Sequence, residues 1–404
     1  MKINKNKILL VNKFFYLNGG SERVFFLERE FLISHGFDII DFSMKDSKNL
    51  NSNFANFFID KVDYTNTKGI IRKLKTGFAF IHSSESVNKI TKIIKHEKPN
   101  IAHLHNIYHQ LTPSIIPILK ENKIKVILTL HDGKLCCPSY LMLNRGKPCL
   151  KCAGTHFHYP ITTNCQQTLA RGILLSLEAY FHAWKKSYDG VDAFIVPSIF
   201  LGNIVAPRIG HSKTHLIRNG IDQTKFIPST KDDGYLLYVG RLSSEKGIDT
   251  LLKAHSCMNN ISKLVIVGTG PLEYKLRSHA SSSVIFKGYC TGENLWELVK
   301  KSSCLIVPSE WYENAPMTIL EGMAFAKPII ASRIGGIPEQ VVHGETGILF
   351  TPGNTHELSQ ALDAMMTDTD MRRRMGINGR LRLEKEFSIQ SHNQQLLNLY
   401  QSFL

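Results

Sequence analysis

Short apolar runs recur along the whole chain, and each is followed by a glycine or polar loop and then by a stretch with helical spacing. Such short runs are typical of strands buried on both faces of a parallel sheet. Their alternation with helices predicts an α/β fold. The expected strands are Lys7–Val11, Phe37–Phe42, Ile101–Leu104, Lys125–Leu130, Tyr235–Val239, Lys263–Val267, Val284–Phe286, Cys304–Val307, Pro328–Ser332 and Gly347–Phe350.

These strands form two groups, and the turn signal Asn219-Gly220 lies close to the junction between them. We therefore expect two doubly wound parallel-sheet domains that face each other across a cleft. The first spans residues 1–214 and the second residues 215–385, while residues 386–404 form a helix that packs back on the first domain. Ligands of open α/β sheets bind at the carboxyl ends of the strands, so the cleft is the expected binding region.

The chain's net charge of +15 lies entirely in its first half. Residues 1–218 carry 30 Lys and Arg against 15 Asp and Glu, whereas residues 219–404 carry 19 of each. This asymmetry indicates an anionic partner for the first domain: nucleic acid, a membrane surface or a phosphorylated substrate. Solubility alone is the other interpretation. No nucleic-acid-binding motif is present, and aromatic residues are not interleaved with the basic ones, so we expect no nucleic acid partner.

We expect no targeting segment in the chain. The basic N-terminus, with Lys2, Lys5 and Lys7, precedes an apolar run, Ile8–Val11, that is too short for a signal peptide. No run of about 18 apolar residues predicts a spanning helix. We expect a cytoplasmic protein, at most peripheral on the inner face of the membrane.

Five of the eight cysteines fall in one stretch of the first domain: Cys136, Cys137, Cys149, Cys152 and Cys165. In a chain without an export signal, thiols or metal ligands are expected rather than disulfides. The Cys149-x2-Cys152 pair, with Cys137 and Cys165 nearby, fits a structural zinc site. The alternative is a reduced loop over the cleft that shapes the acceptor pocket.

The segment Leu169–Lys186 follows, and its spacing predicts a helix with apolar and aromatic residues on most faces. Arg171, Lys185 and Lys186 lie at its ends. Such a helix suits a membrane interface, and a core helix of the first domain is the competing interpretation.

Two cations follow an expected strand of the second domain. The turn at Gly240 places Arg241 and Lys246 at the carboxyl end of Tyr235–Val239, just before a helix. Two cations together with helix N–H groups make a site for a diphosphate. Two solvated basic side chains are the plain alternative.

Carboxylates and glycines mark the other loops. Glu313 precedes the expected helix Met317–Phe325, and Glu321 lies inside it, so both can reach a ligand that lies across the helix start. Carboxylates suit vicinal hydroxyls such as those of ribose or a hexose. Glycines after strands, at Gly19-Gly20, Gly268-Thr269-Gly270 and Gly335-Gly336, permit close approach of a ligand to the backbone, although each alone is often only a turn.

In this order, the motifs resemble the retaining family 4 glycosyltransferases of the GT-B fold. The resemblance covers nearly the whole chain. It rests on Gly19-Gly20-Ser21-Glu22-Arg23, Thr129-Leu130-His131-Asp132, Asn219-Gly220-Ile221-Asp222, Tyr238-Val239-Gly240-Arg241, Glu245-Lys246-Gly247, Val267-Gly268-Thr269-Gly270-Pro271, Pro308-Ser309-Glu310, and the pair Glu313 and Glu321.

The resemblance implies a role for each matching residue. Arg241 and Lys246 would hold the donor diphosphate, and Glu321 the ribose hydroxyls. Glu313 would hold hydroxyls of the donor sugar, and His131 would face the reacting sugar, with a merely hydrogen-bonded strand-end histidine as the alternative. The catalytic set is thus His131, Glu313, Arg241 and Lys246. Further donor-lining positions are Gly19, Gly20, Gly240, Gly268, Gly270, Tyr289, Asn314, Ala315, Met317 and Thr318.

The implied reaction is retaining transfer of a hexose from a UDP- or GDP-sugar to a hydroxyl of a glycan or a polyprenyl-pyrophosphate-linked acceptor. Surface polysaccharide biosynthesis, of lipopolysaccharide or capsule, is the expected context. The departing phosphate would help to deprotonate the acceptor, and no metal or other cofactor is required. Asp368-Thr369-Asp370 looks like a metal motif of another glycosyltransferase fold, but its polar surroundings indicate a solvated turn.

Two other classes remain as alternatives. One is a GT-B-type epimerase or phosphorylase, or another enzyme, that acts on a nucleotide sugar or a glucan. A phosphorylase would need a pyridoxal lysine and is usually much longer. The other is a non-catalytic basic binding protein.

Overall fold

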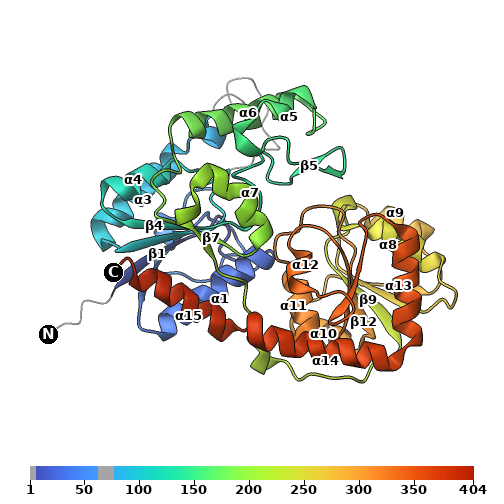
Figure 1. Ribbon diagram of the computed structural model, residues 1–404. Helices are drawn as coiled ribbons and strands as arrows, with labels where there is room; N and C mark the ends of the chain where they lie inside the picture. The colour runs from blue at the N-terminus through green and yellow to red at the C-terminus, as the bar shows by residue number, and fades with distance from the viewer. Residues whose placement is uncertain (1–5, 62–76) are drawn as a thin grey trace.

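The computed structural model describes residues 6–61 and 77–404, so Lys2 and Lys5 lie outside the described residues. It contains two six-stranded sheets, and every strand pair within them is parallel. Helices flank both sheets, and the two α/β domains lie side by side (Figure 1). The predicted fold class is confirmed.

The N-terminal sheet has the strand order β2-β1-β3-β4-β7-β8. Its strands are β1 Lys7–Val11, β2 Asp38–Phe42, β3 Ile101–Leu104, β4 Lys125–Thr129, β7 Ala193–Val196 and β8 Thr214–Leu216. Its main helices are α1 Gly20–Ser34, α3 Ser84–Glu97, α4 Ile115–Glu121 and α7 Ile199–Ile209. The last two strands were not expected. Because β8 pairs with β7, this domain extends to at least Leu216, beyond the expected boundary at 214/215.

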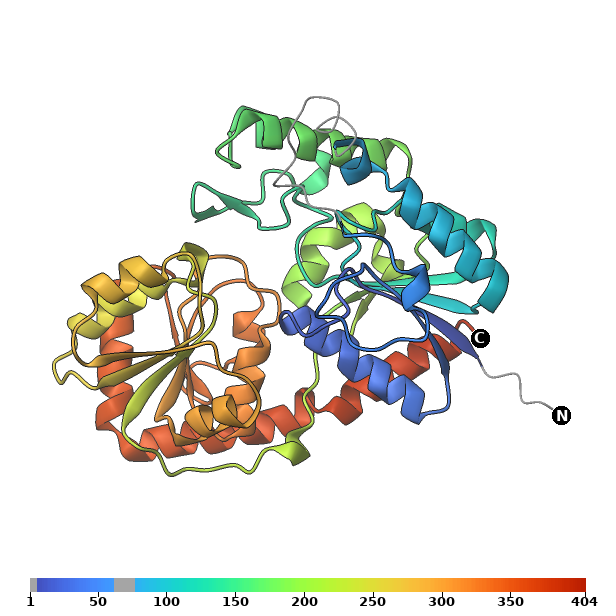
Figure 2. The ribbon, with the colours of Figure 1, turned by 180° about the vertical axis from the view of Figure 1, so that it is seen from behind.

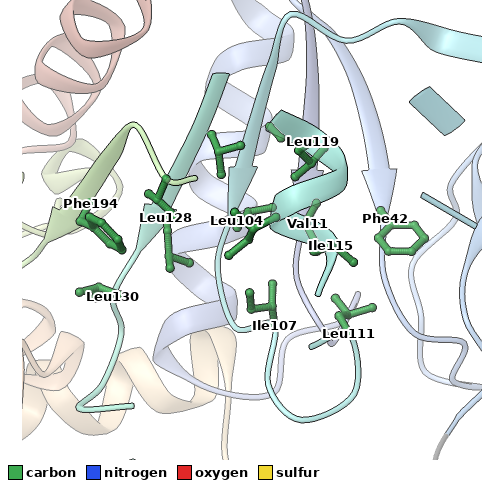
Figure 3. Packing of buried hydrophobic residues seen from close by; sticks show 14 of the residues in the cluster. Val11, Phe42, Leu104, Ile107, Leu111, Ile115, Leu119, Leu128, Leu130 and Phe194 are labelled. Atoms are coloured by element: carbon green, nitrogen blue, oxygen red, sulfur yellow. The ribbon is translucent and has the colours of Figure 1, made fainter. Parts of the chain in front are cut away.

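Apolar side chains from both faces of this sheet form its core. Val11, Leu104 and Leu128, on adjacent strands, pack against Ile115 and Leu119 of α4 (Figure 3). All five side chains are buried. Such burial on the sheet face is what the continuous apolar runs of the sequence predict.

The C-terminal sheet has the order β11-β10-β9-β12-β13-β14. Its strands are β9 Tyr235–Val239, β10 Lys263–Val267, β11 Val284–Gly288, β12 Cys304–Val307, β13 Ile329–Ser332 and β14 Gly347–Phe350. Its helices are α8 Ile248–Ser256, α9 Glu273–His279, α10 Gly292–Lys301, α11 Met317–Ala324, α12 Ile337–Gln340 and α13 Thr355–Thr367. The chain reverses direction across the sheet between β9 and β12, which places a ligand crevice at the carboxyl ends of these central strands.

Two helices close the chain. Helix α14, Thr369–Glu386, belongs to the C-terminal domain, and Asp368 caps it by accepting a hydrogen bond from the Met371 amide at 2.8 Å. Helix α15, Ile389–Gln401, crosses to the N-terminal domain (Figures 1 and 2). There Leu396 and Tyr400 join the buried cluster around Ile8.

A long excursion leaves the N-terminal sheet between β4 and β7. It contains the hairpin β5 Leu143–Asn144 and β6 Lys147–Pro148, and the helices α5 Tyr159–Thr162 and α6 Leu169–Trp184. The buried ammonium of Lys134 ties α6 to the loop after β4, because it lies 2.7 Å from Glu178 of α6. Short 3₁₀ turns elsewhere are η1 Ala55–Phe57, η2 Ala153–Thr155, η3 His211–Lys213, η4 Gln223–Lys225 and η5 Ser244–Lys246.

Helices long and apolar enough to cross a membrane are absent from residues 6–61 and 77–404.

Candidate active site

The loop after β9 is shaped by glycine. Gly247 has a φ of +68°, and a Cβ atom there would lie 1.8 Å from the carbonyl oxygen of Pro308. Only glycine tolerates both the backbone conformation and the contact. The close approach sets Lys246 against the loop after β12, whereas Arg241 stays exposed at the rim.

Lys246 and Glu313 form an ion pair in this region. The Lys246 ammonium lies 2.6 Å from Oε1 of Glu313 and 4.8 Å from the centre of the Trp311 ring. The Ser309 hydroxyl donates to the same carboxylate oxygen at 2.7 Å. Burial by itself would raise the pKa of Glu313, but Lys246 and the Ser309 hydrogen bond lower it below its ordinary value. Glu313 is therefore an ionised carboxylate beside a cation, fixed before any ligand arrives.

The loop that carries Glu313 is fixed from behind by Gly335 and Gly336. The Gly336 amide donates to the Glu313 carbonyl at 2.8 Å. A Cβ atom on Gly336 would lie 1.8 Å from the Asn314 carbonyl oxygen, and one on Gly335 would lie 2.2 Å from that of Glu313. These glycines therefore allow two loops to pack together.

Two helix N-termini meet where the domains touch. Helix α1 begins at Gly20, and α11 begins at Met317 after Pro316. A Cβ on Gly20 would lie 3.6 Å from Cγ of Met317, so the two helix starts are neighbours. Gly19, Ala315 and Thr318 flank this junction in sequence. Backbone N–H groups and the positive ends of two helix dipoles favour an anion here.

Asn314 joins the domains beside this junction. Its Nδ2 donates to the Leu130 carbonyl at 3.1 Å, and its Oδ1 accepts from the Ser198 hydroxyl at 2.6 Å. Leu130 immediately precedes His131. A hydrogen bond thus joins the predicted donor loop to the residue that precedes the predicted catalytic histidine.

Glu321 has a partner that was not expected from the sequence. Its buried carboxylate forms an ion pair with the guanidinium of Arg23, on the first turn of α1. Burial lowers the pKa of Arg23, while Tyr289 nearby raises it. The Gly-Gly-Ser-Glu-Arg motif that opens α1 was the available signal, because it puts Arg23 at the same helix start as the glycines.

Gly268 and Gly270 lie in close contact with the backbone of the loop after β9. Gly268 has a φ of +131°, and a Cβ there would lie 2.0 Å from the Gly240 carbonyl oxygen. A Cβ on Gly270 would lie 2.4 Å from the Leu242 carbonyl oxygen. The glycines thus let the loops after β9 and β10 lie against each other. Tyr289, after β11, is exposed.

His131 follows β4 and stacks on His105, with ring centroids 5.1 Å apart. Its Nε2 lies 2.9 Å from Nδ1 of His105. Burial, with a smaller contribution from His105, holds the pKa of His131 well below its ordinary value, so the ring is neutral near pH 7. Burial also raises the pKa of the neighbouring Asp132 to about 6.

The cysteine stretch gathers loosely around Cys152. Burial raises the pKa of this thiol, and Cys137, Cys165 and Cys149 are near enough to raise it further. In the described ranges, the ligand atoms that come within 4.8 Å of one another are instead those of Glu28, His103 and His105. Zinc on Cys137, Cys149, Cys152 and Cys165 stays a prediction.

Helix α6 is half buried. Leu175 and Ala179 face the protein, whereas an apolar row along the opposite face is exposed. That row consists of Leu169, Ile173, Leu177, Tyr180 and Trp184. The helix therefore fits neither a pure core helix nor one that is apolar all round.

Comparison with known proteins gives a consistent picture. The model of the family described as Glycosyltransferase Family 4 matches residues 18–225, and that of Glycosyl transferases group 1 matches residues 221–382. An uncharacterized glycosyltransferase of Methanocaldococcus jannaschii, MJ1178, is 26% identical over 318 residues, covering 77% of this chain and 76% of that protein.

Solved structures with the same fold extend over nearly the whole chain. Sucrose-phosphate synthase from Thermosynechococcus elongatus has a TM-score of 0.73 at 20% identity, covering 98% of this chain and 99% of that one. Anabaena Alr3699/HepE, in complex with UDP and glucose, has a TM-score of 0.67 at 17% identity, covering 98% and 100%.

Proposed function

The chain belongs to the glycosyltransferase family that these models describe and has the GT-B fold; from this premise we propose that it is a retaining hexosyltransferase. It would move a sugar from a UDP- or GDP-sugar to a hydroxyl of a glycan or lipid-linked acceptor in surface polysaccharide biosynthesis. The observation that carries the proposal is the Lys246–Glu313 pair, 2.6 Å apart, beside the two helix N-termini at the domain junction. It sets a cation for a diphosphate next to a carboxylate for sugar hydroxyls.

The mechanism follows from the charges that develop. As the sugar–phosphate bond breaks, negative charge grows on the leaving diphosphate. Lys246, Arg241 and the N–H groups of α1 and α11 would stabilise that charge, as donors fixed in place before the reaction do. Glu313 holds hydroxyls of the sugar. Glu321 holds hydroxyls of the ribose after its ion pair with Arg23 has opened. The departing phosphate accepts the acceptor's proton.

The nucleotide-sugar donor has support from a structural neighbour, since Alr3699/HepE is in complex with UDP and glucose. The first experiment is a panel of UDP- and GDP-sugars, scored for slow release of nucleotide diphosphate. Glu313→Ala should abolish the release, whereas Glu297→Ala, an exposed carboxylate on α10 of the same domain, should leave it unchanged. Release that survives Glu313→Ala contradicts the proposal.

Stereochemistry and product identity separate the alternatives. A retaining transferase gives a product with the donor's anomeric configuration, which proton NMR reads directly. An epimerase would instead convert the donor into a second nucleotide sugar or a free epimer without an acceptor. The proposal requires no divalent metal at the diphosphate, so adding or omitting Mg²⁺ or Mn²⁺ should leave turnover unchanged.

Zinc in the cysteine loop is a separate proposal. Purified protein should hold one equivalent, and the single change Cys152→Ser should release it. Cys257→Ser, at an exposed cysteine of α8's C-terminal end, is the control. Purified protein that holds no zinc and is insensitive to chelator would contradict the zinc proposal.

The exposed face of α6 supports an acceptor held at an anionic membrane. Trp184 is 73% exposed and Leu177 55% exposed, and the Lys185 ammonium lies 4.6 Å from the centre of the Trp184 ring. An apolar row with aromatic residues and flanking cations suits the headgroup region of an anionic lipid leaflet. The excursion that carries α6 leaves the carboxyl end of β4, the edge that also carries His131.

Vesicle flotation tests this surface. Vesicles with phosphatidylglycerol should carry the protein up the gradient, and vesicles of phosphatidylcholine alone should carry much less. Leu177→Glu should abolish flotation, whereas Leu381→Glu, which puts the same charge on an exposed leucine of α14, should not. Equal loss from both variants, or no flotation of the wild type, would refute the surface.

A further inference from the structure

A row of buried side chains runs from His131 into the core of the N-terminal domain. Nε2 of His131 lies 2.9 Å from Nδ1 of His105, and Nε2 of His105 lies 3.4 Å from Oε2 of Glu28. The other oxygen of Glu28 lies 3.1 Å from Nε2 of His392. The row joins the loops after β4 and β3 to helices α1 and α15, and its last three members are almost completely buried.

The inner end of the row is an ion pair. Nδ1 of His392 lies 2.8 Å from the carbonyl oxygen of Arg218, and its Nε2 faces the Glu28 carboxylate. Both partners only accept hydrogen bonds, so both nitrogens of His392 carry protons. Burial would lower the pKa of His392, but the Glu28 carboxylate raises it above its ordinary value. Burial would likewise raise the pKa of Glu28, yet His103, His105 and His392 hold it well below the ordinary range.

The carboxylate dictates where the remaining protons lie. Oε2 of Glu28 accepts only, so the facing Nε2 of His105 carries a proton. His392 already balances the Glu28 charge, and a second buried cation would be unbalanced. His105 is therefore neutral, its Nδ1 is a lone pair, and Nε2 of His131 must donate to it. A neutral His131 then has its own lone pair on Nδ1.

That nitrogen is the one available to a ligand. Among the residues described, Nδ1 of His131 has no hydrogen-bond partner, and His131 adjoins Leu130, which Asn314 contacts across the domain junction. A lone pair at this position accepts a hydrogen bond from a hydroxyl, whereas the other tautomer would present a proton. The direction of the row thus decides what His131 offers to a sugar.

We propose that Glu28 is a positioning residue which, through His105, fixes the tautomer and ring orientation of His131 so that Nδ1 accepts a hydrogen bond from a hydroxyl of the donor sugar. This rests on the proposed function. The new element is that Glu28, which orients His131, lies in the core and is separated from the substrate by two side chains, His105 and His131.

A metal ion is the competing explanation, because ligand atoms of Glu28, His103 and His105 lie within 4.8 Å of one another. Both ring nitrogens of His103 already have hydroxyl partners, however: Nδ1 lies 2.7 Å from the Tyr400 oxygen and Nε2 lies 2.7 Å from Oγ1 of Thr129. Oε2 of Glu28 and Nε2 of His105 face each other at 3.4 Å and have no other hydrogen-bond partner among the residues described. Metal analysis therefore belongs to the test.

The first measurement needs no variant and no substrate. Long-range proton–nitrogen NMR spectra of the full chain, labelled with nitrogen-15 in histidine, identify the tautomer of each ring. We expect His131 and His105 as Nε2–H tautomers and His392 as an imidazolium. A His131 that carries its proton on Nδ1 overturns the proposal, and so does a stoichiometric metal ion that Glu28→Gln releases.

The second measurement combines kinetics with the spectrum. In Glu28→Gln, we expect His131 to lose its single tautomer and kcat for donor hydrolysis to fall about 10- to 100-fold, the usual cost of removing an orienting partner, with KM for the donor changed less than about twofold. Glu28→Asp should restore part of kcat. Tyr400→Phe removes a hydroxyl from the same buried cluster but not from the row, and should change neither kcat nor the tautomer.

The outcomes separate positioning from mere stability. If Glu28→Gln and Tyr400→Phe lose activity equally, or if Glu28→Gln keeps its kcat and its tautomer, the proposal is overturned. A wild type that turns over no nucleotide sugar would refute the proposed function alone, because the wild-type spectrum tests the tautomer without substrate.

Discussion

The two domains present the same architecture to the junction but hold their side chains in different ways. In the C-terminal domain, Lys246, Ser309 and Glu313 act from loops that touch through glycine backbones. In the N-terminal domain, His131 is held by a core carboxylate, Glu28, through a second histidine. One side is thus built from loop geometry and the other from buried side chains.

The difference extends to charge. The C-terminal half balances 19 basic with 19 acidic residues, and the N-terminal half carries the whole excess. The proposed diphosphate site consists of local cations and helix N-termini, which need no overall positive charge. The excess positive charge lies in the half of the chain that also carries the exposed face of α6. Substitutions in the packed loops of the C-terminal domain and among the buried side chains of the N-terminal domain should therefore have different effects.

Lys246→Ala should have the largest effect, because it removes the cation that pairs with the buried Glu313 carboxylate. We expect kcat for donor hydrolysis to fall about 100- to 1000-fold, as when one preorganised partner of a developing charge is lost. Lys253→Ala, at an exposed lysine of α8 in the same domain, is the control and should stay within about twofold. A loss below threefold for Lys246→Ala would mean that the loop pair does not carry the charge.

Gly247→Ala tests whether the donor side depends on backbone contact. Its Cβ would lie 1.8 Å from the Pro308 carbonyl, and its φ is +68°. Gly234→Ala has a similar φ of +71° with nothing within 4 Å, so it isolates the conformational cost. We expect the free energy of unfolding to fall by about 1 kcal/mol for Gly234→Ala and by about 3 kcal/mol or more for Gly247→Ala. The fall in Tm of each variant measures this loss. Equal losses would show that the Pro308 loop simply moves.

The same difference explains what the sequence could reveal. The fold class follows from apolar runs that are local. Of the two unexpected strands of the N-terminal sheet, β8 has only three residues, two of them polar, whereas β7 is a short apolar run. The donor-side candidates could be named because each belongs to a short motif whose loop geometry is local. The structure brings Lys246 and Glu313 together, and it places Asn314, Gly20 and Met317 at one junction.

On the N-terminal side the sequence carried fainter signals. His103 and His105 alternate at the end of β3 and so share a face, and Glu28 lies four residues from both Val24 and Leu32 on the buried face of α1. A carboxylate on an apolar helix face was a usable hint. Its partner His392 was not predictable, because it is 364 residues away and reaches Glu28 only when α15 crosses to the N-terminal domain. Arg23 stands in the motif that opens α1, but its pairing with Glu321 was missed because Glu321 belongs to the other domain.

Asp132→Asn tests the cost of burying charge on the N-terminal side. Burial raises the pKa of Asp132 to about 6 from 3.8, so the folded protein binds this proton more tightly than the unfolded chain. The stability contributed by the protonated form is complete below pH 4 and is lost as the pH rises through 6. The free energy of unfolding of Asp132→Asn, relative to that of the wild type, should therefore rise by up to about 3 kcal/mol between pH 4 and pH 7. Urea unfolding at both pH values measures this gain, and a pH-independent difference would show that Asp132 titrates normally.

Glu339→Gln tests where the two regions meet, and its effect should be the smallest. Glu339 of the C-terminal domain accepts hydrogen bonds from the Ile199 and Phe200 amides at the start of α7, at 2.9 and 2.8 Å, and pairs with Arg218 at 3.2 Å. The amide keeps one acceptor but loses the charge that the helix start favours, which is worth about 0.5 to 1 kcal/mol. A small fall in Tm at low salt should shrink at 1 M salt, where the Debye length is about 3 Å. Glu345→Gln, an exposed carboxylate in the same domain, should show neither. A fall in Tm that salt does not change would mean that packing, and not the charge of Glu339, stabilises the contact between the two domains. The difference in charge between the domains would then play no part at this contact.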